Sequence, residues 1–329
     1  MKKFKFLGFS ILLTGILIAM IIPFQSCEDK IDDNDIDNDN CIYKCDSSIK
    51  FINNYIDKDV RMLHIDKNGQ LWIGTYSGIS VYSNHLVRGV LSIYTIAITS
   101  DKSGVCWFGG NGLFKYEAGQ ITSYTIENGL VDPNISAIAI DNSGTKWIGT
   151  WGGGVSRYND TIWTSYTQFD ILSDNFITCI KTDMENNVWI GTRNGGVNEY
   201  NGTIWKKYST IDGLVDNYVT SIIIDKQNNK WFGTYGGGLS MFDGITWKTY
   251  LLGDGSALEN IIQFLELDLK GYIWIGTSTG LYKYDGSTFT AIDNCVGSGR
   301  LFSIAADSIN NIWIGNINGV SKLICINNK

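Results

Sequence analysis

Short stretches of β-branched and aliphatic residues, separated by turns, recur along most of the chain. Residues 135–140 are typical of the first stretch in each repeat, and the segment Trp-Ile-Gly-Thr at residues 147–150 is typical of the second. A glycine-rich link leads to a third stretch, such as residues 154–158, and a tight turn leads to a fourth, such as residues 247–250. Runs of this length and composition, bounded by Gly, Asn and Asp, predict β-strands. After the N-terminal apolar segment, no stretch has the spacing of a helix.

A motif present in seven copies sets the period of this pattern. The segment Trp-[Ile/Phe]-Gly begins at Trp72, Trp107, Trp147, Trp189, Trp231, Trp274 and Trp313. An aspartate stands six residues before each tryptophan: Asp66, Asp101, Asp141, Asp183, Asp225, Asp268 and Asp307. Four short strands in a repeat of roughly 40 residues match one blade of a β-propeller. The sequence therefore predicts an all-β fold, a seven-bladed β-propeller with four antiparallel strands per blade.

The turn that precedes each tryptophan has a constant chemistry. Three residues after each aspartate stands glycine or asparagine: Gly69, Gly104, Gly144, Asn186, Asn228, Gly271 and Asn310. These two residue types best tolerate the positive φ at the end of a short hairpin loop. An aspartate at the start of a turn accepts hydrogen bonds from the backbone amides of that turn. Both positions are therefore expected to be structural and not catalytic.

The seventh repeat lacks a fourth strand, because it ends with residues 319–325. A surplus strand, residues 49–52, stands before the first repeat, and we expect it to complete blade seven and close the ring. A disulfide between Cys45 and Cys325 is expected beside this closure, with Cys41 as the alternative partner of Cys325. Cys106 and Cys179 are expected to be buried small apolar residues, and Cys295 has no assigned role.

The N-terminal segment differs from the repeats. Met1-Lys2-Lys3 is followed by an apolar run over residues 6–22 and by Ser26-Cys27, the layout of a secretory signal. It resembles a bacterial lipoprotein signal, which implies that Cys27 becomes the lipidated first residue. An uncleaved membrane anchor and a soluble cleaved product are the alternatives. The expected product is secreted across the inner membrane and lipid-anchored, on the periplasmic face or on the outer-membrane surface.

Residues 28–40 are rich in aspartate and asparagine. A solvated tether is preferred to a calcium loop, because the glycine of the sharp turn and the closing glutamate are missing. Acidic residues directly after the lipidated cysteine also resemble the surface-export signals of Bacteroidetes lipoproteins. The expected organisation is a signal peptide over residues 1–26, an acidic tether over residues 27–47 and the propeller over residues 48–326.

Charge and composition exclude some classes of function. The chain has 33 acidic and 26 basic residues, so it lacks the basic footprint that nucleic-acid binding requires. Its two histidines, His64 and His85, are too few for a multi-histidine metal site, and they do not suggest a histidine-based catalytic triad. We therefore expect no cofactor, no metal and no catalytic residues.

The repeats resemble the two-component regulator propeller family. The resemblance covers about residues 48–326 and is clearest over residues 141–166, 183–208 and 225–250. It is carried by the aspartate turn, the Trp-Ile-Gly-Thr strand and the strand Gly-Gly-[Val/Leu]-x-x-[Tyr/Phe]. In that family, propellers often form the periplasmic part of sensor kinases that respond to oligosaccharides. No second propeller, transmembrane exit or kinase is recognised here, so the resemblance implies ligand binding and not signalling by this chain alone.

The loops after each second strand and the loops between blades are expected to gather on one face of the propeller. The first set presents Tyr76, Asn111, Trp151, Arg193 and Tyr235, together with Ser278 and Asn316. The second set presents Asp174, Asp216 and Arg300, together with Asn128, Asp132, Asn217 and Glu259. Aromatic faces beside polar side chains are what a sugar-binding surface requires.

The leading hypothesis is a non-catalytic binding module of the cell envelope, glycan-binding or sensory, whose partner is a glycan or an envelope protein. Contact with the membrane is expected through the lipid anchor only. One alternative is a lyase or hydrolase acting on polysaccharide, in which carboxylates such as Asp174 and Asp216 would act as acid and base. The other alternative is a scaffold on which envelope proteins dock.

Overall fold

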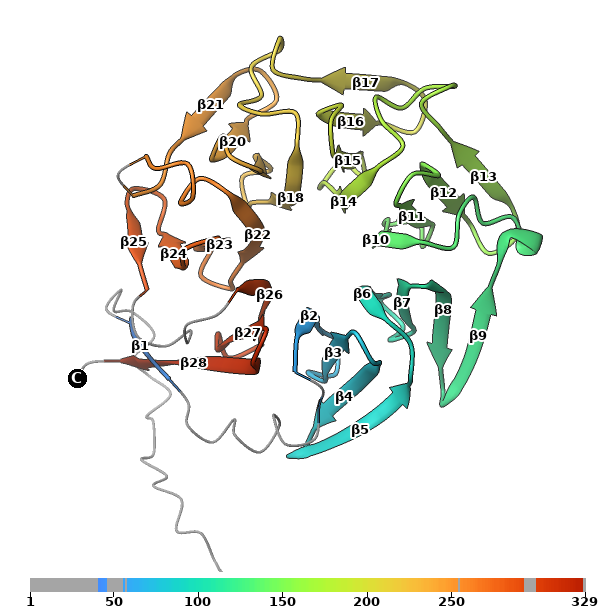
Figure 1. Cartoon of the computed structure of the whole chain (residues 1–329), viewed down its shortest axis with the longest axis horizontal. Helices are drawn as coiled ribbons and strands as arrows, with labels where there is room; N and C mark the ends of the chain where they lie inside the picture. Colours follow the sequence, from blue (N-terminus) through green and yellow to red (C-terminus); the bar gives the residue numbers. More distant parts are fainter. Residues whose placement is uncertain (1–40, 46–55, 57, 254, 293–299, 328–329) are drawn as a thin grey trace, which may run out of the picture. The chain divides into compact units, whose positions relative to one another are not determined.

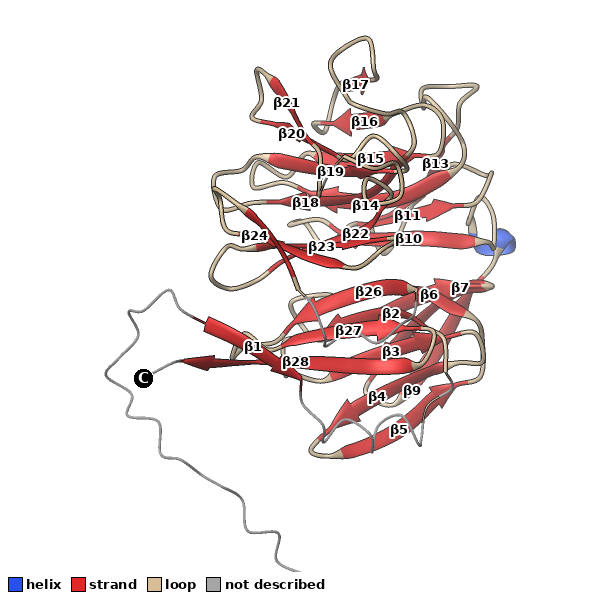
Figure 2. Cartoon of the chain, turned by 60° about the vertical axis from the view of Figure 1, so that its left-hand side comes forward, coloured by secondary structure: helices blue, strands red, loops and turns tan. Residues whose placement is uncertain are grey.

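The computed structural model describes residues 41–45, 56, 58–253, 255–292 and 300–327. These residues form seven separate four-stranded antiparallel sheets, arranged as blades around a central axis (Figure 1). The predicted seven-bladed β-propeller is therefore confirmed. Among the described residues almost all regular structure is strand, with one short 3-10 helix at Ile126–Asn128 (Figure 2). Within the described ranges, no helix is long and apolar enough to cross a membrane.

Each blade runs from an inner to an outer strand. Blade one consists of β2 (Val60–Ile65), β3 (Leu71–Thr75), β4 (Ile79–Ser83) and β5 (Leu86–Leu91). Blade two consists of β6 (Thr95–Ser100), β7 (Cys106–Gly110), β8 (Gly112–Glu117) and β9 (Gln120–Tyr124). Blade three consists of β10 (Ile135–Ile140), β11 (Lys146–Thr150), β12 (Val155–Tyr158) and β13 (Trp163–Tyr166). Blade four consists of β14 (Ile177–Thr182), β15 (Val188–Thr192), β16 (Val197–Tyr200) and β17 (Trp205–Tyr208).

The remaining blades repeat this order. Blade five consists of β18 (Val219–Ile224), β19 (Lys230–Thr234), β20 (Leu239–Phe242) and β21 (Trp247–Tyr250). Blade six consists of β22 (Ile262–Leu267), β23 (Ile273–Thr277), β24 (Leu281–Tyr284) and β25 (Phe289–Ala291). Blade seven consists of β26 (Leu301–Ala306), β27 (Ile312–Asn316), β28 (Gly319–Asn327) and β1 (Cys41–Cys45). Contacts between β2 and β26 close the ring of inner strands.

Blade seven is completed by an N-terminal strand, as predicted, but the strand begins earlier in the chain. β1 pairs antiparallel with β28, with Tyr43 opposite Cys325 and Cys45 opposite Leu323. The strand that we had expected there, residues 49–52, lies outside the described residues. Residues 42 and 43 are isoleucine and tyrosine, which favour a strand as strongly as the segment that we had chosen.

The disulfide at this closure stays a prediction. The register places Cys325 opposite Tyr43, so Cys41 and Cys45 are both one diagonal step from it. The side chains of these three cysteines, and the whole of Cys27 and Cys295, lie outside the described residues. Both other cysteines are free thiols: Cys106 is buried, and Cys179 is partly buried. Burial raises the pKa of both thiols, that of Cys179 to about 12.

The aspartate of each turn accepts backbone amide hydrogens, as predicted, and it also binds the tryptophan. In blade five, Asp225 Oδ1 accepts hydrogen bonds from the backbone N of Gln227 and Asn229, at 3.0 and 2.8 Å. Its Oδ2 accepts a hydrogen bond from Trp231 Nε1 at 2.9 Å. The same aspartate–indole bond, 2.9–3.1 Å long, occurs in six blades. This bond explains the constant spacing of six residues in those six blades.

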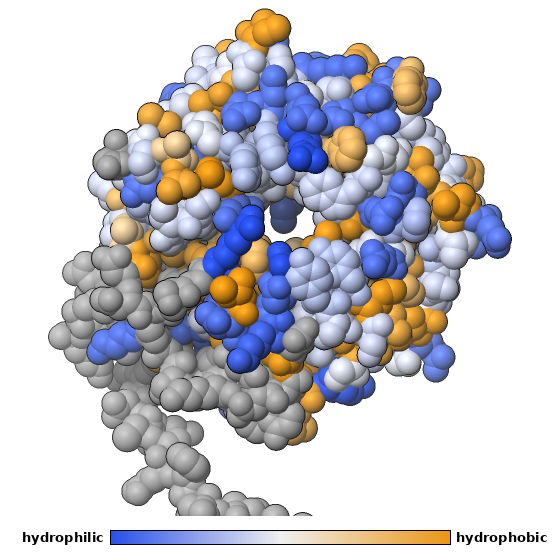
Figure 3. Space-filling view, viewed as in Figure 1, coloured by the Kyte–Doolittle hydropathy of each residue, from blue (hydrophilic) through white to orange (hydrophobic). Residues whose placement is uncertain are grey.

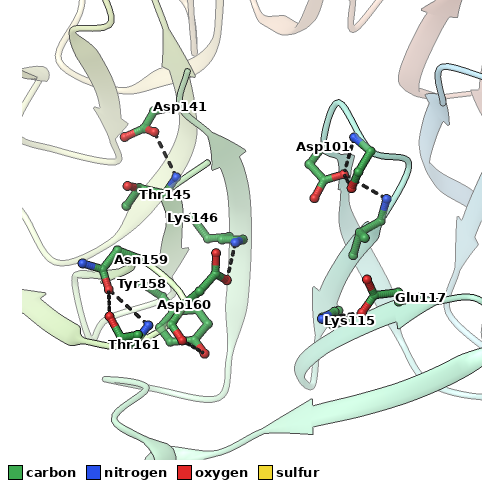
Figure 4. Close-up of polar contacts among 12 residues, drawn as sticks. Asp101, Lys115, Glu117, Asp141, Thr145, Lys146, Tyr158, Asn159, Asp160 and Thr161 are labelled. Carbon is green, nitrogen blue, oxygen red and sulfur yellow. Dashed lines mark hydrogen bonds and ion pairs between the residues drawn. The ribbon is translucent and has the colours of Figure 1, made fainter. Parts of the chain in front are cut away.

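Blade two is the exception to this pairing. Asp101 accepts a hydrogen bond from Ser103 Oγ at 2.5 Å and from three backbone amides of its own turn. Trp107 Nε1 has no hydrogen-bond partner among the described residues. Figure 4 shows this turn beside that of blade three, where Asp141 accepts a hydrogen bond from the backbone N of Thr145. The Asp101 carboxylate therefore stabilises its own turn and does not bind the indole of Trp107.

The glycine of the Trp-Ile-Gly segment allows neighbouring blades to pack. A Cβ atom on Gly149 would stand 2.4 Å from Cγ2 of Ile177 in the next blade. A Cβ atom on Gly233 would stand 2.5 Å from Cγ2 of Ile262. Protein interiors are packed too densely to absorb such overlaps, so the third residue of the motif is fixed by packing between blades.

Candidate functional site

The two predicted sets of loops lie together around one mouth of the central channel, on the face that we call the upper face. Trp151 N donates a hydrogen bond to Asn134 O of its own blade at 2.9 Å, and Trp151 forms a β-bridge with Phe176 of the next blade. Arg193 N likewise donates to Phe176 O at 3.0 Å. The residue after a second strand is therefore held beside the residue that precedes a first strand. Figure 3 shows the hollow at the centre of the ring and the hydrophilic and weakly polar side chains around it.

Five residues of blades three to five are neighbours on this face, and we call them the aromatic arc: Trp151, Phe176, Arg193, Tyr218 and Tyr235. The rings of Tyr218 and Tyr235 are stacked, with centroids 4.8 Å apart. Arg193 Cζ lies 6.0 Å from the ring centroid of Phe176 and 5.9 Å from that of Tyr218. Trp151, Phe176 and Tyr235 are 39%, 40% and 48% exposed. The arc thus presents large aromatic surfaces to solvent around one cation.

A second aromatic group surrounds Arg61, where blades one, two and seven meet. Arg61 Cζ lies 4.3 Å from the ring centroid of Tyr76 and 3.9 Å from that of Phe302. Arg61 also donates a hydrogen bond to Asp59 Oδ2 at 2.8 Å. Tyr76 stacks on Tyr94 with centroids 5.0 Å apart, and burial raises the pKa of the Tyr94 hydroxyl. Two rings lie over this guanidinium and Asp59 neutralises its charge. We therefore assign Arg61 a structural role at the mouth of the channel.

Other predicted residues lie elsewhere on the ring. Asn111 is exposed and forms a β-bridge with Asn134. Arg300 is exposed, with Cζ 5.6 Å from the ring centroid of Phe302. The placement of Asn316 in the ring was wrong, because Asn316 ends β27 and is buried. Ile317 takes that position instead, and its N donates to Arg300 O at 3.3 Å.

Asp174 and Asp216 support the arc from their loops. Asp174 Oδ1 accepts a hydrogen bond from Phe176 N at 3.1 Å, and its Oδ2 accepts one from Asn194 N at 2.9 Å. Asp216 Oδ1 accepts a hydrogen bond from Tyr218 N at 2.9 Å. Asp174 is only 7% exposed. Each carboxylate therefore fixes the backbone that presents an aromatic ring of the arc.

Sequence reasoning missed five residues of the two groups: Arg61, Tyr94, Phe176, Tyr218 and Phe302. They lie at or just before the start of an inner strand, and none of these five positions had been predicted to belong to the site. A signal was present, because Asp-Asn followed by an aromatic residue occurs at both 174–176 and 216–218. The side chain before an inner strand points to the mouth of the channel, and only the three-dimensional ring shows which residues meet there.

The loop that carries Trp151 depends on glycine. Gly152 N and Gly154 N both donate hydrogen bonds to Asn175 O of the next blade, at 3.2 and 3.1 Å. Gly154 has a φ of 89°, and a Cβ atom there would stand 2.2 Å from the carbonyl oxygen of Tyr166. The position of Trp151 therefore requires a residue without a side chain three positions later.

Gly154→Ala is expected to lower the free energy of unfolding by about 2–3 kcal/mol. Left-handed backbone costs a non-glycine residue about 1–2 kcal/mol, and the clash with a carbonyl oxygen adds to this. Gly144→Ala is the matched control, because Gly144 has a φ of 82° but nothing within 4 Å of its Cβ position. Denaturant unfolding of both variants measures the difference. Equal losses would contradict the role given to close packing at Gly154.

The central channel encloses a cavity of about 560 Å³, lined by inner-strand residues of every blade. His64, Lys181 and Glu266 occupy equivalent positions on three of these strands, eight residues before the blade tryptophan. Burial raises the pKa of Glu266 to about 7, and the nearby Lys181 ammonium opposes this rise. Burial also lowers the pKa of His64 to about 4. His64 Nε2 lies 2.8 Å from Ser100 Oγ.

The upper face is equipped for binding by stacking and hydrogen bonding. Three of its carboxylates, Asp132, Asp174 and Asp216, accept hydrogen bonds from backbone amides of their own loops. Within the described part of the chain, no three His, Cys, Asp or Glu side chains come close enough to hold a metal ion. The exposed groups include aromatic faces, amides and the guanidinium groups of Arg193 and Arg300.

Known proteins resemble this chain in its repeats and in its fold. A family model described as two component regulator propeller matches residues 54–77, 171–194 and 213–236. Two similar solved structures are extracellular domains from B. thetaiotaomicron. That of BT3049, described as a hybrid two-component system, has 25% identity over 81% of this chain and 39% of that chain, with a TM-score of 0.69. That of BT4673, described as a one-component system, has 22% identity over 80% and 38%, with a TM-score of 0.68.

This chain spans less than half the length of those two domains. Virginiamycin B lyase from Staphylococcus aureus is similar in fold alone, with 14% identity over 82% of this chain and 96% of that chain, and a TM-score of 0.69. No curated protein matches the chain.

Proposed function

We propose that the chain, three segments of which match the two component regulator propeller family model, is a non-catalytic binding module of the bacterial cell envelope that takes a glycan on the aromatic arc. The observation that carries this proposal is the exposure of three large aromatic side chains, Trp151, Phe176 and Tyr235, in one arc. Burying an aromatic surface of this size is favourable, and a gathered set marks a site of interaction.

Sugars suit this surface for two reasons. The C–H faces of a pyranose stack on aromatic rings, and its hydroxyl groups need hydrogen-bonding partners at the edge of the stack. The arc supplies stacked rings at Tyr218 and Tyr235 and a further ring at Trp151. Backbone hydrogen bonds between adjacent blades hold these rings in place. A fixed surface binds more tightly, because less side-chain entropy is lost on binding.

The location in the envelope rests on the comparisons and on the N-terminus. The two B. thetaiotaomicron neighbours are extracellular domains. The basic start, apolar run and Ser26-Cys27 of this chain support export and lipidation of Cys27. The proposed product is therefore a lipid-anchored propeller whose upper face captures a glycan at the cell surface or in the periplasm.

Trp151→Ala is expected to weaken binding of a glycan about tenfold or more, since a stacking ring contributes roughly 1 kcal/mol beyond its buried area. Isothermal titration of the full-length chain, purified in detergent, against neutral and acidic polysaccharide fragments measures this. Phe169→Ala is the matched control, because Phe169 is an aromatic residue 87% exposed on the loop before β14, outside the arc. Equal losses in the two variants, or no binding by any fragment, would overturn the proposed site.

A scaffold for envelope proteins is the second candidate. The loops between blades expose large apolar side chains at their tips: Ile126 (61%), Phe169 (87%) and Ile211 (95%). Apolar groups this exposed are common in protein interfaces. If the protein unfolds cooperatively and yet binds none of the polysaccharide fragments in the titration, the result would favour this candidate.

A further inference from the structure

The aromatic arc contains one charged side chain, Arg193, which forms no ion pair with the residues that the structure describes. The Arg193 side chain is exposed. The chain has only five arginines in a protein of net charge −7. An arginine placed at the centre of a proposed glycan surface therefore needs an explanation.

The neighbouring carboxylates do not neutralise this guanidinium. Asp174 uses Oδ1 for Phe176 N and Oδ2 for the backbone and side-chain nitrogens of Asn194. Asp216 directs Oδ1 to Tyr218 N at 2.9 Å. Arg61 is different, since it forms an ion pair with Asp59 at 2.8 Å. Arg193 thus keeps its positive charge available on the upper face.

The position of the Arg193 guanidinium beside aromatic rings favours a ligand that stacks on a ring and carries a negative charge. Arg193 Cζ is about equally distant from two rings, 6.0 Å from the centroid of Phe176 and 5.9 Å from that of Tyr218. Trp151 extends the aromatic surface beyond Phe176, and Tyr235 extends it beyond Tyr218. A sugar stacked on either side would bring a substituent of its ring toward the same guanidinium.

The chemistry of the guanidinium selects among such substituents. Its planar set of donors matches the two oxygens of a carboxylate, and the pair of charge-assisted hydrogen bonds is stronger than bonds to neutral hydroxyls. Arginine is also less strongly hydrated than lysine, and it remains charged at every physiological pH. A hydroxyl or amide of a neutral sugar would leave most of this capacity unused.

We infer that the aromatic arc selects acidic oligosaccharides, with the Arg193 guanidinium binding the carboxylate of a uronate residue stacked on the flanking rings. This inference rests on the proposed glycan binding and narrows it to one class of ligand. The interaction is exposed, so its strength decreases as salt screens the charges.

The test compares each acidic ligand with its uncharged counterpart. Isothermal titration of the full-length chain uses oligogalacturonate and its methyl ester, and a glucuronate-terminated oligosaccharide and its methyl ester. Esterification keeps the ring and the hydroxyl groups and removes only the charge. The expected result is that at least one acid binds about tenfold or more tightly than its ester, with a preference that shrinks at high salt.

Variants at residue 193 assign the preference to this side chain. Arg193→Gln should bind acid and ester equally, and Arg193→Lys should keep part of the preference, since it keeps the charge without the planar donors. Thermal unfolding midpoints equal to that of the parent chain exclude a folding defect.

Equal binding of acid and ester by the parent chain, or an unchanged preference in Arg193→Gln, would overturn the inference. Binding of neutral fragments in a manner that depends on Trp151, without binding of either acid, would also overturn it while leaving the proposed glycan function in place. If no fragment binds, both the inferred preference for acidic ligands and the proposed glycan-binding function are overturned.

Discussion

Asp183→Ala is expected to destabilise the propeller by about 3–5 kcal/mol, because it leaves a buried lysine without its counter-ion. Asp183 lies in the turn between β14 and β15 of blade four, and its side chain is fully buried. Its Oδ2 accepts a hydrogen bond from Trp189 Nε1 at 2.9 Å and lies 3.4 Å from Nζ of Lys230 in blade five. The Lys230 side chain is only 8% exposed, so water cannot replace the lost carboxylate.

Asp101→Ala is the matched control for this prediction. Asp101 occupies the same place in blade two, but its Oδ1 binds only its own turn, and no ion pair of Asp101 occurs among the described residues. Its loss should cost about 1 kcal/mol, the usual net contribution of hydrogen bonds in a turn. Urea unfolding of both variants at pH 7 measures the two free energies.

A second substitution separates the charge effect from the turn effect. If the uncompensated ammonium dominates, Asp183→Ala combined with Lys230→Met should recover most of the lost stability, since replacing a buried ion pair by apolar groups is often neutral. Similar losses for Asp183→Ala and Asp101→Ala would show that the ion pair between blades contributes little. Failure of the double variant to recover would assign the loss to the turn and the indole bond.

Glu266→Gln is expected to stabilise the fold by about 2–3 kcal/mol at pH 8 and by very little at pH 4.5. Burial in the channel raises the pKa of Glu266 from 4.5 to about 7, with the Asp268 charge adding to the rise and Lys181 opposing it. The folded state therefore binds a proton more tightly than the unfolded state. Stability from this group is fully present below pH 4.5 and is lost as the pH rises through about 7. Glutamine stays neutral and avoids the loss.

Free energies of unfolding at several pH values between 4.5 and 8 measure this effect. Glu127→Gln is the matched control, since Glu127 is exposed on the upper-face loop between β9 and β10 and should show no pH-dependent difference. His64 acts in the opposite direction: its pKa is lowered to about 4, so it contributes stability above pH 6.5 that is lost as the pH falls through 4. A pH-independent effect of Glu266→Gln would contradict the burial of the carboxylate.

The candidate site was only partly predictable. Trp151, Arg193 and Tyr235 could be placed on one face because each follows the second strand of a repeat, a position that the Trp-Ile-Gly-Thr motif fixes. Their partners Phe176 and Tyr218 were missed, since these contacts join the end of a second strand to the start of a first strand, within one blade or in the next blade. The supporting role of Asp174 could not be predicted either, because its partner Asn194 lies 20 residues further along the chain.

The sequence by itself determined the number of blades, the four strands of each blade and the turn chemistry, because these depend on local propensity repeated every 35 to 43 residues. Short-range rules suffice where each strand pairs with the next strand in sequence. Tertiary structure alone decided which N-terminal segment completes blade seven, that Asp183 pairs with Lys230, and that Arg193 lies near two aromatic rings. The same holds for the pKa of Glu266, which depends on strands of other blades. Each of these features depends on how the blades pack around the axis, and a local pattern of residues does not encode which side chains meet there.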